Sequence, residues 1–399
     1  MDVLTLVLAW AGVAGAAFFF GGVTQPEWGI CMGLVGVAGV VYWLGTAKYK
    51  RAEGDGWLVW GVCGVVVWTA VQTRWFSVAP GRGVEYIFTN AAAGGMLLLG
   101  RELGWRYRRR VWVTVAPLLV VAVLEGALGL VQFFAMRAGA GPADSATGTY
   151  PNRNHFAGLL EMALPLAVAG AWAWRKTWWA AAGMLGVAGL LVMGTVVSLS
   201  RMGFMAALAG LFVMGMMLVG GRGKVLVGVG LVLAGAFLLL PTDEWIARFA
   251  SIARTEDISG DTRAQIWRDT IPLIRDYWKT GVGMGAYEVA FYKYKNVAPM
   301  GTVDYAHNDY LQYLAELGVV GFGLGLSVIG RCFYWMTKGS GALVAGTWGA
   351  AAAMALHSLV DFNMYIPANV LMLAWILGLG AATALTEEGR AGSGSGGRW

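Results

Sequence analysis

The chain has 399 residues, of which 58% are hydrophobic and 13% charged, with a formal net charge of +6 and a mean hydropathy of +0.61. A soluble protein of this length could not bury so much apolar surface, so the composition excludes a soluble globular protein and predicts a membrane protein. The three cysteines have no paired spacing, which argues against a disulfide framework and against a zinc site.

Apolar runs of about 17–25 residues predict transmembrane helices, and the chain has about twelve of them. They lie at 3–23, 28–46, 57–72, 84–100, 111–134, 155–174, 178–198, 203–220, 224–240, 309–330, 342–360 and 365–385. The first run lacks a basic leading segment and is expected to stay as an anchor. We therefore expect an all-α polytopic membrane protein, with transmembrane helices 1–9 in residues 1–240 and helices 10–12 in residues 309–386.

The remaining residues form one long loop and a tail. Residues 241–308 are the one long polar interruption and predict a loop with short helices, whereas residues 387–399 predict a flexible Gly/Ser-rich cytoplasmic tail. Basic residues gather after the even-numbered runs, for example at 48–51 and 106–110, and are sparse in the short connections on the other side. The positive-inside rule then predicts cytoplasmic termini and a loop on the outer face, which is the periplasm in a bacterium.

Polar residues occur at the predicted outer ends of the sixth to eighth runs. Arg153 and His155 lie at a helix start for which Asn154 is the expected cap, a stretch that is mostly structural unless Arg153 contacts a substrate. Arg201 lies in an almost uncharged turn, where it either snorkels to the interface or serves function, since ionisable groups within membranes are functional candidates. Glu161 lies within a run and needs a partner, for which Arg153 or Arg201 could serve.

Arg263 is the sharpest candidate in the long loop. Thr262 is a plausible N-cap of a loop helix, and the apolar residues that recur along one face of this helix are Trp267, Ile271, Ile274 and Trp278. Arg263 falls on that face, and a buried arginine needs an anionic partner, either a ligand or a loop carboxylate such as Asp257 or Asp261. A separate basic stripe, expected to face solvent or lipid headgroups, consists of Arg268, Arg275 and Lys279.

His307 comes just before a predicted membrane helix. Asn308 can cap that helix, and Asn308, Gln312 and Glu316 then share one side, which must face the bundle interior or a wet cavity. Imidazole is the side chain best suited to accept a proton near neutral pH, so His307 is the candidate base. The alternative is a polar residue that marks the membrane interface.

Three further patterns bear on the chemistry. His357 and Asp361, four residues apart, are expected to share a helix face and to form a hydrogen-bonded pair, favoured over direct catalysis. The G-x-G-x-G pattern at 281–285 predicts a flexible turn that returns the loop to the membrane. No carboxylate pair in the loop has metal-ligand spacing, so we expect a metal-independent reaction.

Two arginines and a histidine at an outer membrane face fit one reaction type. The planar fork of arginine suits phosphate oxygens, and two arginines can neutralise a pyrophosphate. A pyrophosphate on a sugar is a leaving group that needs charge stabilisation rather than protonation. His307 could then take the proton of an incoming hydroxyl. Nucleotide sugars are not expected outside the cytoplasm, so the donor would be polyprenyl-linked; the residues permit this transfer without compelling it.

Several short motifs occur in a fixed order along the chain. They are 151–158 with 164–165, 200–203, 263–267 with 281–283, 306–312 with 316–318, and 357–363. Over roughly 150–370 this set closely resembles the O-antigen ligase and O-antigen polymerase family.

The resemblance implies a membrane-embedded, inverting, metal-independent glycosyltransferase of the GT-C type, without a cofactor and without a nucleic-acid partner. It implies a glycan moved from undecaprenyl diphosphate to an acceptor on the periplasmic side of the bacterial inner membrane. By motif position it places Arg201 and Arg263 at the diphosphate and His307 near the acceptor. Ligation to lipid A-core is preferred, polymerisation of lipid-linked repeat units is the close alternative, and a lipid-linked glycan transporter is a third.

Overall fold

The computed structural model describes residues 2–23, 27–46, 52, 54–139, 145–219, 223, 228, 260–296, 298 and 301–393. Within these ranges the regular structure is entirely helical. The long helices are α1 Asp2–Phe18, α2 Glu27–Thr46, α3 Gly56–Trp75, α4 Pro80–Arg106, α5 Trp112–Arg137, α6 Arg153–Ala173, α7 Trp178–Val197, α8 Arg201–Leu218, α11 Gly260–Asp276, α13 Asp309–Met336, α14 Gly341–His357 and α15 Pro367–Ser393. The short ones are α12 Tyr287–Phe291 and the 3₁₀ helices Phe20–Gly22 and Asn363–Tyr365.

The helices confirm the prediction of an α-helical polytopic membrane protein. Eight of them are long and apolar enough to cross a membrane: α2, α3, α5, α6, α7, α8, α13 and α15. The apolar helices α1 and α14 have 17 residues each, and α4 has 27. Apart from residue 228, the predicted run at 224–240 lies outside the described residues, so twelve spans stays a prediction.

Two helices form the centre of the bundle. Within their membrane spans, 83% of the residues of α6 and 94% of those of α15 are buried, against 22–39% in the other six candidate spans. Close packing of α15 on α4 depends on small residues: a Cβ atom on Gly378 would lie 2.2 Å from the Leu97 carbonyl oxygen. The outer helices therefore present apolar side chains outward, as a bilayer requires.

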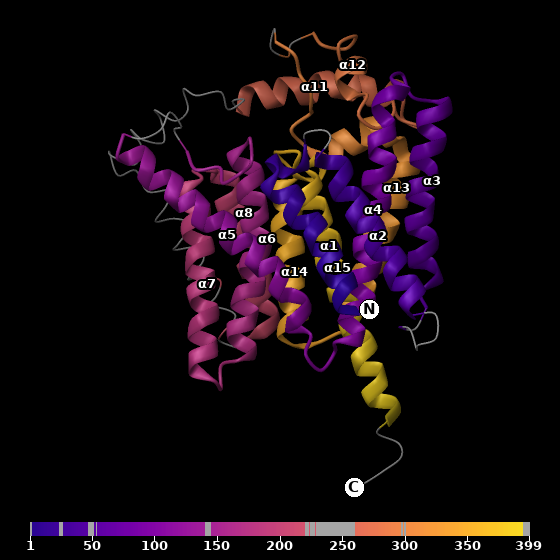
Figure 1. Ribbon diagram of the computed structural model, residues 1–399. Coiled ribbons are helices and arrows are strands. Elements are labelled where there is room, and N and C mark those ends of the chain that lie inside the picture. Colours follow the sequence, from indigo (N-terminus) through magenta and orange to yellow (C-terminus); the bar gives the residue numbers. More distant parts are fainter. Residues whose placement is uncertain are drawn as a thin grey trace.

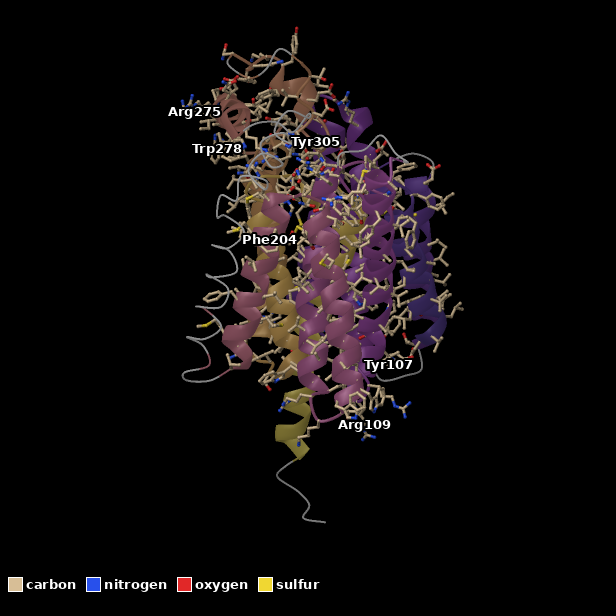
Figure 2. The ribbon with its side chains drawn as sticks, turned by 90° about the vertical axis from the view of Figure 1, so that its left-hand side faces the viewer. Tyr107, Arg109, Phe204, Arg275, Trp278 and Tyr305 are labelled. Atoms are coloured by element: carbon tan, nitrogen blue, oxygen red, sulfur yellow. The ribbon has the colours of Figure 1, made fainter. Side chains whose placement is uncertain are left out.

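The loop helices lie at one end of this bundle. Figure 1 shows α11 running across the helix ends together with α12, whereas the end of α15 lies at the opposite end. Tyr107 and Arg109, from the basic cluster after α4, also lie at that opposite end (Figure 2). The structure thus separates the described part of the long loop from this basic cluster; which end faces the periplasm stays a prediction.

The loop returns to the bundle by pairing with a break in α13. Gly318 has φ 63° and ψ −178°, which interrupts the helix and leaves nearby backbone groups available for hydrogen bonds with the loop. Val282 and Gly283 donate to the carbonyl oxygens of Ala315 and Glu316, both at 3.0 Å, and Val319 donates to that of Trp278 at 2.8 Å. The expectation of a flexible turn at 281–285 is wrong, because the segment is largely buried and paired with α13.

We expect Gly318→Ala to destabilise the protein. Its backbone conformation is open almost only to glycine and costs other residues about 1–3 kcal/mol; an added Cβ would also lie 2.4 Å from the Lys279 carbonyl oxygen. Thermal unfolding of the detergent-solubilised protein measures the loss. Gly323→Ala is the matched control in the same helix, since nothing lies within 4 Å of its Cβ position. Equal unfolding temperatures for both variants would contradict the pairing argument.

Candidate active site

The turn before α13 holds His307 in an unusual conformation. His307 has φ 49°, a left-handed conformation that non-glycine residues seldom adopt. Directly after it, the Asn308 side chain accepts a hydrogen bond from the Leu311 amide at 3.0 Å, which confirms the predicted cap of α13. The Asn308 amide also donates to the Leu359 carbonyl oxygen at 2.8 Å. The cap therefore joins this turn to the segment between α14 and α15 and holds His307 against it.

A buried carboxylate from that segment faces two imidazoles. Oδ1 of Asp361 lies 3.7 Å from Nδ1 of His307 and 3.7 Å from Nε2 of His155, which are ion-pair distances rather than hydrogen bonds. Burial opposes ionisation of Asp361, but the two facing imidazoles hold its pKa well below the usual range. Asp361 is therefore an anion at neutral pH, placed to stabilise positive charge on either ring.

One aromatic ring holds this cluster together. The Phe362 ring packs edge to face against His155, with centroids 4.6 Å apart, and against His307 at 5.0 Å. On Phe362 the Tyr305 ring stacks at 4.0 Å, nearly parallel. The two imidazoles are thus fixed in orientation by packing as well as by charge.

The predicted pair of His357 and Asp361 is wrong. Helix α14 ends at His357, so the residues after it leave the helical path and the two do not share a helix face. His357 instead lies 2.9 Å from Glu161 on α6, through its Nδ1 atom, and both side chains are fully buried. Glu161 thus has a histidine partner, where the sequence had suggested an arginine.

Helix α6 begins two residues earlier than the sequence predicted. Asn152, not Asn154, caps the helix, because its side chain accepts from the Asn154 amide at 2.7 Å. Arg153 is the first residue of α6 and is partly buried, whereas His155 is 4% exposed. The Asn369 amide on α15 donates to the His155 carbonyl oxygen at 3.0 Å, which fixes the height of α6 against the bundle centre.

Helix α11 buries a face that differs from the predicted one. It begins at Gly260, so Thr262 lies inside its first turn rather than capping it. Ile271 and Trp278 are 48% and 53% exposed, and the fully buried side chains are Ile266, Thr270 and Leu273. This rotated face is the one that meets the loop core, a hydrophobic cluster formed by α11, α12 and the residues around the start of α13. The same face also buries the polar residue Thr270. The basic stripe of Arg268, Arg275 and Lys279 is exposed, as expected.

Arg263 remains on the buried side of α11 after this correction. It is one turn from Trp267, whose indole nitrogen donates to the Ala306 carbonyl oxygen at 2.9 Å, directly before His307. The Nε atom of Arg263 is buried and has no hydrogen-bond partner in the described part of the chain. Asp257 and the Asp261 side chain, its suggested partners, lie outside the described residues.

Arg201 reaches the same end of the bundle from α8. It is exposed at the first position of that helix, which Ser200 caps by accepting from the Gly203 amide at 3.1 Å. Gly203 packs on Ala157 of α6, so the start of α8 lies beside the start of α6 and His155. Figure 2 shows Phe204, one turn into α8, in the α11 half of the bundle, below Tyr305.

Glu316 has a role that the sequence did not indicate. Its carboxylate accepts from the backbone amides of Gly285 and Tyr287 at 3.0 and 3.1 Å and from the Tyr365 hydroxyl at 2.7 Å. Gln312 donates to it at 3.2 Å and accepts from the Ala306 amide at 2.6 Å. The predicted polar side of α13 thus clamps the loop onto the helix, and its spacing was the only signal in the sequence.

In the described ranges, no group of three or more His, Cys, Asp and Glu side chains is placed to hold a metal ion. Metal independence concerns the reaction itself and stays a prediction.

The sequence matches one known family. The family model described as O-antigen ligase matches residues 186–326. That region contains Arg201, Arg263 and His307, whereas His155 and Asp361 lie outside it. Among curated proteins the chain has no match.

Proposed function

Through residues 186–326 the chain belongs to the O-antigen ligase family, and on that premise we propose that it transfers a glycan from undecaprenyl diphosphate to an acceptor hydroxyl. The transfer takes place at the bundle end that carries α11, which is the periplasmic face of the inner membrane. The acceptor is the sugar of lipid A-core.

In this reaction the acceptor oxygen attacks the anomeric carbon, and the bond from that carbon to the diphosphate oxygen breaks. Attack from the opposite side inverts the anomeric centre. Arg263 and Arg201 neutralise the charge that the departing diphosphate gains, through hydrogen bonds from their planar guanidinium groups. The buried Nε of Arg263 supports this role, because it has a donor to offer and no described partner.

His307 takes the acceptor proton as the new glycosidic bond forms. The resulting imidazolium faces the Asp361 carboxylate, 3.7 Å away, and is stabilised by it. This histidine–carboxylate pair is the observation that carries the proposal, and its histidine lies directly after Ala306, which Trp267 of α11 contacts. The left-handed backbone of His307 adds support, since such strained residues cluster at functional sites.

Purified protein in liposomes, supplied with a defined lipid-linked glycan and lipid A-core, tests the proposal through the glycosylated lipid formed. Product on lipid A-core is the expected result; longer lipid-linked chains instead would identify a polymerase. In cells, deletion should remove glycan from lipid A, whereas loss of a polymerase leaves single-repeat caps. Failed glycan export with intact transfer in liposomes would favour a transporter.

We expect Asp361→Asn to lower kcat by roughly 10–100-fold, within the range of a general-base contribution, with the donor KM little changed. The acidic limb of the pH–rate profile should also move to lower pH, because the imidazolium loses its anionic partner. A merely structural role would lower the amount of active enzyme without moving that limb. An unchanged profile with reduced kcat would therefore assign Asp361 to folding alone.

A further inference from the structure

A second polar site lies at the α11 end of the bundle. It is a cavity of about 240 Å³ between the start of α4, the loop before α12 and the segment before His307. Its lining includes Arg82, Glu85, Tyr86, Glu288, Asp304 and Tyr305. None of these residues has a role in the chemistry described above.

Two aromatic rings connect the cavity to His307. Tyr305 lines the cavity, stacks on Phe362 with centroids 4.0 Å apart, and Phe362 in turn contacts the His307 ring at 5.0 Å. Tyr305 also precedes His307 by only two residues, and Figure 2 shows it at the α11 end of the bundle. A molecule in the cavity would therefore be separated from the candidate base, His307, by the stacked rings of Tyr305 and Phe362.

The charges of the cavity do not suit a diphosphate. Glu85, Glu288 and Asp304 supply three carboxylates, whereas Arg82 is the one basic residue in the described lining and is paired with Glu288. Like charges brought together at a binding site cost several kcal/mol in general, so an anionic group would be rejected. Carboxylates instead accept hydrogen bonds from hydroxyl or amino groups, and tyrosine faces pack on apolar surfaces.

The size of the cavity fits a single ring. Sites for drug-sized ligands have roughly 300–1,000 Å³, which exceeds this cavity. Glu316 forms part of the lining, but its oxygens are already bonded to Gly285, Tyr287 and Tyr365, so it supports the site rather than recognising a ligand. Besides this clamp, the cavity is lined by the carboxylates of Glu85, Glu288 and Asp304 and by the two tyrosines, which are the groups that a ligand would contact.

We infer that this cavity binds one neutral or amino-bearing sugar ring of the acceptor, while the donor diphosphate lies at the arginines. The assignment to the acceptor rests on the proposed transferase function. It gives the two substrates separate recognition sites of opposite charge, with the acceptor site joined to His307 through Tyr305 and Phe362.

Transfer kinetics in liposomes test the acceptor assignment. A Glu85→Gln and Asp304→Asn double variant should raise the acceptor KM about tenfold, as for the loss of a charge-assisted hydrogen bond, with kcat and the donor KM within about twofold. Asp276→Asn removes an exposed carboxylate of α11 outside the cavity and should change none of these constants. An unchanged acceptor KM, or a raised donor KM, would overturn the assignment.

A binding measurement separates this inference from the transferase proposal. Saturation-transfer NMR with methyl glucoside, methyl galactoside and glucosamine, on the protein in nanodiscs, should detect at least one sugar. The double variant should lose that signal and the Asp276→Asn control should keep it. Signal without transfer would reject the proposed function and retain the sugar site, whereas transfer with no sugar signal, or a signal that the double variant keeps, would reject the site.

Discussion

Asparagine at position 307 should reduce glycan transfer by about 10²–10⁴-fold, the contribution of a general base, while the protein still folds and binds the donor. Asparagine is the informative substitution because it tolerates the left-handed backbone that His307 adopts. It cannot accept the acceptor proton near neutral pH. Single-turnover transfer in liposomes, compared with donor binding and thermal unfolding, measures the effect on chemistry apart from that on folding.

His307→Ala separates the chemical loss from backbone strain. It should lose transfer to the same extent but also unfold at a lower temperature, since alanine is less suited than asparagine to φ 49°. Full transfer by purified His307→Asn would end the assignment of a base at this position. Partial transfer that keeps the pH dependence of the unmodified protein would instead show that His307 orients the hydroxyl.

The second large effect is expected at Arg263. Arg263→Ala should lower kcat by about 10²–10³-fold, as loss of one donor to a developing anion does elsewhere, and should also weaken donor binding. Arg263→Lys keeps the charge but lacks the planar fork, so its activity should fall between that of the unmodified protein and that of Arg263→Ala. Transfer rate against donor concentration, measured in liposomes, separates binding from chemistry.

Arg268→Ala is the matched control on the same helix. Arg268 is exposed, whereas Arg263 lies on the packed side one turn before Trp267. The loss of Arg268 should therefore change the transfer rate by less than about twofold. Equal losses at both positions would mean that α11 acts through its overall charge and would remove the specific role of Arg263. Arg201→Ala should resemble Arg263→Ala if both arginines hold the diphosphate.

The membrane helices were predictable because hydrocarbon imposes a length and an apolar composition on every span. Eleven of the twelve predicted runs coincide with described helices, with ends shifted by up to eight residues, and the twelfth is almost wholly outside the described ranges. The cap at Asn308 was also predictable, since capping depends on residues three positions apart. Membrane helices and caps can both be predicted from the sequence because each depends only on residues that are close together in the chain.

Side-chain partners were less predictable. The spacing of His357 and Asp361 indicated one helix face, but α14 ends between them, and each then pairs with a residue far away in the chain. The face of α11 was misplaced for a related reason. Trp278 and Ile271 are apolar yet exposed, because the loop core packs against a neighbouring face. Periodicity identifies an amphipathic helix, whereas its orientation depends on what packs against it.

The amino-acid sequence by itself determined the helical membrane class, and it predicted the long loop and the residues proposed to bind a diphosphate and to act as a base. Only the tertiary structure decided that Asp361 faces both His155 and His307, that Glu316 clamps the loop, and that a carboxylate-rich cavity lies beyond Tyr305. Hydrophobic length is a property of consecutive residues. Charge pairing across 54 positions, from residue 307 to residue 361, depends on which helix ends the packing brings together.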